Sequence, residues 1–474
     1  MGATLRALRA LVLLCGFCLL SLGMFMLRTT RGEGPPGLPV TEADEPRLWA
    51  LVRELAAATG TRAPDAVVLT GDVDAAVGEE PRLLGLLPGP RCLYLGVPLL
   101  TGLTEARLKA VLAHEYGHFT GGDTRLSALV LRGRVQIGRT VGLFHARTDG
   151  REAAERVCTA YAKLYMRATL SAARAQEYAA DLAAARIAGR DATASALREI
   201  PVLSAAHDFY LDSYATLGLP ARRLPPRGQF FGGFGRMLTA RETELAKLRK
   251  ELPAEPRSPY DPHPPIADRV RRIEALPADG RGAQDDGPAL ALLADPARTL
   301  AALEDAVLTD EVRQFERAGE WAQLLSSSMA VGLASLDTPL HRALACYTAD
   351  RPTLPALLTV IDEGRLWQLA ERLPQPLPGR AAAAQDREFR ESVRPVLRDS
   401  LQSMVLAEFS ARSLLNWEFS WSRPAAVRLP GSASDLDGEA GTEATLRAAV
   451  TAALADHPDT APLRALLPPT AQPV

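Results

Sequence analysis

Two histidines and a glutamate lie within five consecutive residues, in the stretch from His114 through Glu115 to His118. Histidines four positions apart lie on one face of a helix, so both imidazoles can reach a single metal ion. The glutamate between them is placed to take a proton from a metal-activated water. This spacing predicts a hydrolytic zinc site. The alternative is a surface helix that carries two histidines by coincidence.

The flanking residues predict the helix that this spacing requires. Thr104 is a suitable N-cap, and Leu108, Val111 and Leu112 provide one apolar face. Further patterns predict a linker at 32–40, helices at 46–59, 151–189, 239–252 and 263–276, and strands at 66–70 and 91–96. The glycine-and-aromatic segment at 229–235 is predicted to be a connecting loop, and the alternative is a mobile lid over the site.

A catalytic zinc that is held by two histidines needs a third protein ligand and one open position. Glu177 and Asp181 are the best candidates, because on a helix they are one turn apart and share a face. We expect Glu177 to bind the metal. Asp181 would accept a hydrogen bond from the outer nitrogen of a ligand histidine and so fix its tautomer. Alone, the same pattern is common on solvated helix faces, so this prediction depends on the first motif.

Three motifs occur in a fixed order: H-E-Y-G-H-F-T-G-G-D at 114–123, R-A-Q-E-Y-A-A-D at 174–181, and D-P-H-P-P-I-A-D-R-V at 261–270. Together they resemble the HtpX and CAAX-prenyl-protease type of zinc metallopeptidase. The resemblance spans roughly 66–276 and does not reach the C-terminal third. It implies a zincin-like metallopeptidase domain that binds one Zn²⁺ per chain.

The same resemblance assigns a role to each matching residue. The zinc ligands would be His114, His118 and Glu177, and the general base would be Glu115. His263 would lie near the scissile carbonyl and stabilise the oxyanion, with Arg269 nearby to orient the site. Prolines on the C-terminal side of His263 restrict its backbone, which suits this role. The alternative is that His263 belongs to an ordinary loop that leads into a helix.

Two features depart from the family pattern. Relatives often carry an Asn-Ala pair in the edge strand that lines the substrate cleft, where this chain has Asp74-Ala75. Many relatives also have several membrane helices, some of them between the first two motifs. Here that stretch contains Arg132, Arg134, Arg139 and Arg147, which excludes a membrane span. We therefore expect a soluble catalytic domain on a single tether.

Residues 1–31 are expected to form that tether, a transmembrane anchor. The run Ala10–Leu27 is uncharged and has arginines on both sides, and its 18 residues are just sufficient to cross a bilayer. It lacks the small-residue cleavage site of a signal peptide, which is the alternative. The balance of flanking charge favours a single-pass protein of the cell membrane with its catalytic domain outside the cytoplasm.

Composition places the chain among ordinary globular proteins. Hydrophobic residues make up 47% and charged residues 23%, and the net charge of −2 gives no nucleic-acid-binding signature. The five cysteines form no disulfide framework. The predicted fold is mainly α with a small β-sheet (α+β). A metallopeptidase domain at 34–278 is followed by a helical region of unknown function at 288–474, with a polar, glycine-containing boundary at 279–287.

The expected function is hydrolysis of peptide bonds in protein or peptide substrates, which would lie extended along the edge strand. Because backbone pairing tolerates many sequences, unfolded or damaged proteins are plausible substrates. The alternative is a catalytically silent, zinc-stabilised and membrane-tethered binding module, although such a module would not need Glu115. The C-terminal region carries tryptophans at positions 321, 367, 417 and 421. They are either anchors for a protein partner or residues of the buried core.

Overall fold

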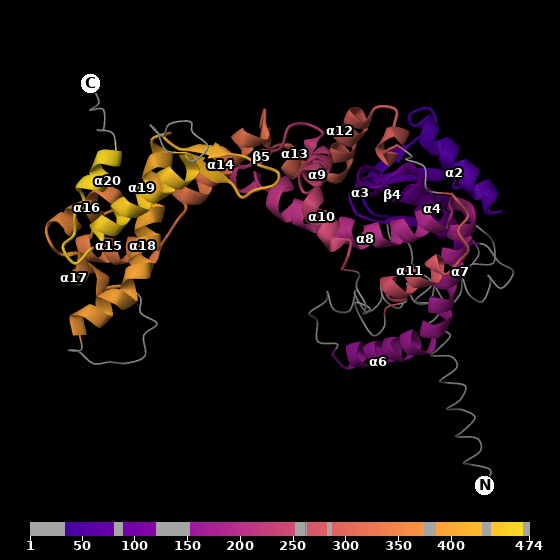
Figure 1. Cartoon of the computed structure of the whole chain (residues 1–474), viewed down its shortest axis with the longest axis horizontal. Coiled ribbons are helices and arrows are strands. Elements are labelled where there is room, and N and C mark those ends of the chain that lie inside the picture. The colour runs from indigo at the N-terminus through magenta and orange to yellow at the C-terminus, as the bar shows by residue number, and fades with distance from the viewer. Residues whose placement is uncertain are drawn as a thin grey trace, which may run out of the picture. The chain divides into compact units, whose positions relative to one another are not determined.

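The computed structural model describes residues 34–79, 89–119, 152–251, 261, 263–281, 287–373, 385–428 and 438–467 (Figure 1). The predicted anchor at 1–31 and the arginine-containing stretch after the first motif lie outside the described residues. Within them, none of the helices combines the length and apolar character that crossing a membrane requires. The chain divides into two compact units, Met1–Leu211 with Gly228–Arg313, and Asp212–Arg227 with Gln314–Val474.

A four-stranded sheet forms the base of the first unit, in the order β1-β2-β4-β3. The central strands β2 (Ala66–Thr70) and β4 (Arg91–Gly96) are parallel, and both match the predicted strands. The outer strands β1 (Gly37–Val40) and β3 (Ala75–Glu79) pair antiparallel to them. The predicted linker is therefore wrong over 37–40, because proline and glycine are tolerated in an edge strand.

Two helices beside the sheet follow the sequence predictions closely. Helix α2 (Pro46–Ala58) buries Leu48, Leu51, Val52 and Leu55. Helix α4 (Glu105–Gly117) carries the first motif, follows the short helix α3 (Val97–Gly102), and packs against α2 and β3. The hydroxyl of Thr104 accepts a hydrogen bond from the backbone N–H of Arg107, which confirms the predicted N-cap.

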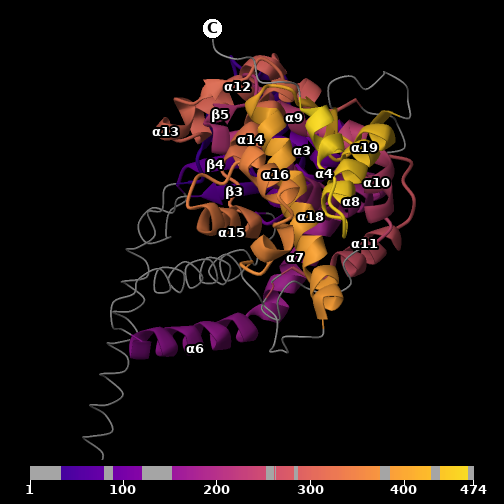
Figure 2. The same ribbon diagram turned by 90° about the vertical axis from the view of Figure 1, so that its left-hand side faces the viewer.

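The predicted helix at 151–189 is two helices, α6 (Glu152–Ala168) and α7 (Leu170–Ala188). The chain breaks at Thr169, whose hydroxyl donates to the carbonyl of Tyr165. Figures 1 and 2 show α6 extending from the start of α7, away from the sheet. Of these two helices, α7 is the one that packs closely against α4. A Cβ at Gly117 would lie 3.0 Å from Cα of Ala180, so the two helices approach as closely as side chains allow.

Two further helices complete the surroundings of α4 and α7. Helix α8 (Arg190–Tyr210) packs against both, and α11 (Ile266–Glu274) packs on α7 and α8. The predicted loop at 229–235 is wrong, because it forms the start of helix α9 (Gln229–Ala240). Burial of Phe231, Phe234 and Met237 on one face outweighs the low helix propensity of its glycines. The helix predicted at 239–252 is instead a separate short helix, α10 (Glu242–Leu248).

The first unit continues beyond the boundary predicted at 279–287. The 3₁₀ turn Ala289–Leu292 packs against α3, and α12 (Pro296–Val307) packs against α9 and β1. Buried Glu45 holds this extension, since its carboxylate accepts hydrogen bonds of 2.6 Å from the backbone N–H of Ala294 and the hydroxyl of Thr299. The short helix α13 (Asp310–Arg313) ends the unit.

The second unit is helical apart from two short strand pairs. The pairs are β5 (Arg223–Leu224) with β6 (Glu316–Arg317), and β7 (Asn416–Glu418) with β8 (Ala426–Arg428). The helices are α14 (Trp321–Ala334), α15 (Pro339–Thr348), α16 (Leu354–Asp362), α17 (Leu366–Ala370), α18 (Gln385–Ala411), α19 (Gly438–Ala453) and α20 (Ala461–Leu466). With this unit, the predicted mainly helical α+β fold is confirmed.

At least three of the four tryptophans in this unit contribute to packing, as the core interpretation predicted. Trp321 is buried, and its ring lies 4.8 Å from that of Trp421 and 5.5 Å from that of Phe419. Trp367 packs against the leucine-rich core of α15 to α20.

The contact between α4 and α7 gives a first prediction. Gly117→Val should lower the free energy of unfolding by about 1–3 kcal/mol, because the added side chain meets the backbone of Ala180. It should also lower the metal content, because the two helices carry different members of the predicted zinc site. Thermal unfolding and metal analysis measure both effects. Gly332→Val on α14 is the control, because nothing lies within 4 Å of Gly332. Equal stability and equal metal content in the two variants would contradict the prediction.

Candidate active site

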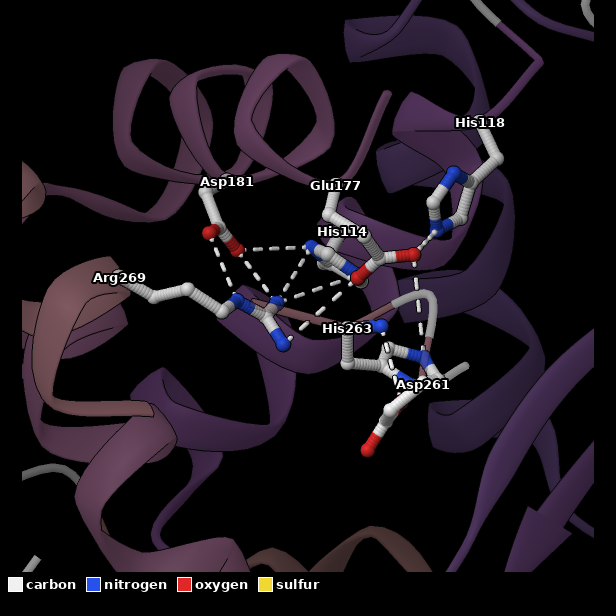
Figure 3. A network of polar contacts seen from close by, with 7 residues as sticks. All are labelled: His114, His118, Glu177, Asp181, Asp261, His263 and Arg269. Carbon is white, nitrogen blue, oxygen red and sulfur yellow. Dashed lines mark hydrogen bonds and ion pairs between the residues drawn. The ribbon is translucent and has the colours of Figure 1, made fainter. Parts of the chain in front are cut away.

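Three segments that are distant in sequence meet at the C-terminal end of α4. Helix α4 and its C-cap supply His114, Glu115 and His118, and α7 supplies Glu177 and Asp181. The third segment comprises α11 and the residues just before it, which supply Asp261, His263 and Arg269. Figure 3 shows the contacts that join these side chains, Glu115 excepted. The structure thus brings together all seven residues that the sequence singled out.

The two imidazoles and the Glu177 carboxylate form a compact set of metal donors. Oε2 of Glu177 lies 3.6 Å from Nε2 of His114, and Oε1 lies 3.6 Å from Nε2 of His118. Metal-binding atoms of His114, Glu115 and His118 lie within 4.8 Å of one another. Buried Oε2 of Glu177 has no hydrogen-bond partner, although a buried carboxylate oxygen normally has one. Two imidazole nitrogens and a carboxylate with one unpartnered oxygen fit a catalytic zinc site.

A buried ion pair lies behind the donor set. Arg269 donates to Asp181 through both Nε and Nη2, at 2.8 and 2.6 Å, and both side chains are less than one-tenth exposed. Oδ1 of the same Asp181 lies 3.0 Å from Nδ1 of His114. Nη1 of Arg269 lies 3.6 Å from Oε2 of Glu177. Arg269 therefore orients the two carboxylates of α7, and Asp181 in turn orients the ring of His114.

The two histidines have opposite electrostatic surroundings. Burial alone would lower the pKa of His114, but the neighbouring carboxylates of Asp181 and Glu177 outweigh burial and raise it to about 9. Burial, together with the nearby charge of His114, lowers the pKa of His118 to about 4. Burial also opposes ionisation of Asp181, yet the hydrogen bonds from Arg269 and His114 bring its pKa down to about 2. Asp181 is thus held as a carboxylate.

Glu115 is suited to proton transfer near neutral pH. Burial raises its pKa to about 7; repulsion from Asp74 and Glu177 acts in the same direction, and His114 opposes them. A base with a pKa near the working pH accepts and returns a proton with little driving force in either direction. Burial likewise raises the pKa of Asp74, which directly precedes the edge strand β3.

His263 lies on the exposed side of the donor set. Its Nε2 is 3.8 Å from Oε1 of Glu177, and its Nδ1 is 3.1 Å from Oδ1 of Asp261. Sequence reasoning gave no role to Asp261. An aspartate two residues before the histidine, in a proline-rich stretch, is typical of an Asx turn and could have drawn attention to it.

Comparisons with known proteins match the part of the chain that contains these residues. The model of peptidase family M48 matches residues 42–276. The "Protease HtpX homolog" of Kineococcus radiotolerans is 30% identical over 255 residues, which cover 50% of this chain and 76% of that protein. No solved structure matches the chain. All the site residues lie within the matched range, whereas most of the second unit lies beyond it.

The buried ion pair gives a second prediction. Arg269→Met should lower the free energy of unfolding by about 3–5 kcal/mol, because Asp181 stays buried without its charged partner. Combining Arg269→Met with Asp181→Leu should recover much of this loss, because the double variant leaves no unpaired charge from the pair. Urea unfolding followed by circular dichroism measures both. Arg271 lies two residues after Arg269 on α11, but its side chain is 75% exposed. Arg271→Met should therefore change the free energy of unfolding little. A single variant as stable as the wild type would show that the pair does not stabilise the fold.

Proposed function

Because the chain belongs to peptidase family M48, and is therefore a protease, we propose that it is a zinc endopeptidase with Glu115 as its general base. The observation that carries this proposal is the placement of the Glu177 carboxylate, 3.6 Å from Nε2 of both histidines and with one buried oxygen unpartnered. His114, His118 and Glu177 would hold one zinc ion per chain. The family membership also agrees with the resemblance inferred from the three motifs.

The proposed reaction needs little movement of the protein. A bound zinc would supply Lewis acidity, lowering the pKa of water and polarising the scissile carbonyl. Glu115 accepts a proton from the attacking water and then gives it to the leaving amine, for which a pKa of about 7 is well suited. His263, on the exposed side of Glu177, donates from Nε2 to the oxygen that becomes negative. Arg269 and Asp181 keep His114 in place throughout.

Strand β3 offers a position for the substrate. Among the described strands it pairs only with β4, which leaves its outer edge available to an extended peptide. It also packs against α4, so a peptide on that edge would lie near Glu115. Main-chain pairing selects for extended conformation more than for sequence, which favours unfolded or damaged proteins as substrates. Asp74, where relatives often have asparagine, would accept a hydrogen bond from the substrate backbone but could not donate one.

The third prediction tests the proposed chemistry. Glu115→Gln should keep stoichiometric zinc and lose casein hydrolysis, because the amide cannot accept the proton. Glu177→Ala should lose most of its zinc, because one of three protein ligands is removed. Metal analysis and a casein assay on the purified full chain measure both. Glu105→Gln is the matched control on α4, since Glu105 is partly exposed and pairs only with Lys109 among the described residues.

The outcomes separate the protease from its alternative. Zinc in the wild type and in Glu115→Gln, with cleavage only in the wild type, supports the proposal. Zinc in both without cleavage would favour the silent, membrane-tethered binding module. Full activity in Glu115→Gln would rule out Glu115 as the base.

We also propose that Ala10–Leu27 anchors the protein in the cell membrane, with the catalytic unit outside the cytoplasm. The support is the uncharged run itself and the arginines around it.

The fourth prediction concerns this anchor. After expression in a bacterium, the full chain should stay in the membrane fraction during an alkaline carbonate wash, whereas a chain that begins at residue 34 should be released. Protease added to intact spheroplasts should degrade the catalytic unit of the full chain. Release of the full chain by carbonate would disprove the anchor, and complete protection from protease would place the unit inside.

A further inference from the structure

One side chain of the site is not held by burial. The side chains of Glu177, Asp181 and Arg269 are all less than one-tenth exposed, and packing restricts their rotamers. His263 is different, because 59% of its side chain is exposed and it precedes α11 rather than lying within it. An exposed histidine normally samples several rotamers. Some other restraint must therefore direct Nε2 of His263 toward Glu177.

The carboxylate of Asp261 provides such a restraint. Its Oδ1 accepts a hydrogen bond of 2.9 Å from the backbone N–H of His263 and lies 3.1 Å from Nδ1 of the same residue. One oxygen thus contacts both the main chain and the ring, which fixes the side-chain torsions of His263. Nε2, on the far side of the ring, lies 3.8 Å from Oε1 of Glu177 (Figure 3). Asp261 itself is only 18% exposed.

The local sequence reduces the conformational entropy that this arrangement costs. Asp261 and His263 each precede a proline, and a following proline disfavours the helical region for both of them. The extended backbone that remains is the one in which an aspartate side chain reaches the N–H two residues later. Little conformational freedom is therefore lost when Asp261 contacts His263.

We propose that Asp261 is a positioning residue, which holds the ring of His263 so that Nε2 faces the reacting carbonyl. This inference rests on the proposed peptidase function. A carboxylate only accepts hydrogen bonds, so Nδ1 of His263 must carry a proton and donate the hydrogen bond that Asp261 accepts. When Nε2 also carries a proton, it donates to the developing oxyanion, and Asp261 lies next to the positive charge of the ring. Asp261 touches neither the metal ligands nor the substrate in this role.

A double-mutant cycle in the full-length enzyme tests the proposal. Asp261→Ala should lower kcat for a fluorogenic peptide by about 10- to 100-fold, with KM within about twofold, because the ring loses its productive orientation. In the His263→Ala background the same substitution should have no further effect. Asp261→Asn keeps an acceptor in the same place and should retain most of the activity. Zinc content should not change in any variant.

The control is Asp268→Ala, an aspartate on nearby α11 that pairs with Arg271 at the surface. It should leave kcat and KM unchanged. Equal losses from Asp261→Ala with and without His263 would show that Asp261 acts on the fold or the substrate instead. No loss from Asp261→Ala would also overturn the proposal.

A second readout does not depend on turnover. In the full chain labelled with ¹³C,¹⁵N-histidine, the His263 signal is assigned by its loss in His263→Ala. The Nδ1 signal of the wild-type ring should be that of a protonated nitrogen hydrogen-bonded to a carboxylate, and Asp261→Ala should shift this signal. An unchanged Nδ1 signal would overturn the positioning role. If the zinc-loaded wild type cleaves nothing, the proposed peptidase function fails, whereas the Nδ1 signal still decides whether Asp261 orients His263.

Discussion

The buried ion pair between Asp181 and Arg269 connects the segments on which the site depends. Its partners are 88 residues apart in sequence, and they join α7 to α11 within a region from which water is largely excluded. Removing two charges from water is costly unless every polar atom is paired. Here the guanidinium donates twice to Asp181 and also faces Glu177, while Asp181 contacts His114. Each charge thus has a partner from another segment, and loss of Arg269 removes the guanidinium that balances both carboxylates of α7.

Close helix packing makes this network possible. Carboxylate side chains are short, so Glu177 and Asp181 reach the histidines only if α7 lies against α4 with almost no intervening side chain. Gly117 and Ala180 provide that contact, and the buried alanines along α7 extend it. Glu115, on the same helix α4, is itself poorly solvated, and this burial raises its pKa toward neutrality.

The sequence predicted best the features that depend on helical periodicity. One face of a helix carries His114 and His118 wherever the fold places that helix, and the same holds for Glu177 and Asp181. To predict the site, it was therefore enough to assume that these two helix faces meet. Long-range contacts were not predictable in this way. Nothing near Glu45 indicates that it binds Thr299 and so extends the first unit to Arg313. Likewise, the glycines of α9 indicated a loop, because burial of Phe231 and Phe234 depends on tertiary partners that the local sequence does not contain.

Differences in exposure around the site define the side from which a substrate can approach. Asp181 and Arg269 close the site on the side of α7 and α11, since neither exposes more than 7% of its side chain. The side chain of His263 is 59% exposed. It is close enough to Asp74, just before β3, to act against the rise in the pKa of that carboxyl. In the proposed function, a peptide paired to β3 would reach Glu115 from the side on which His263 is exposed. A substrate-facing group cannot be fixed by burial without blocking that path, so a short-range contact such as that from Asp261 is the restraint compatible with access.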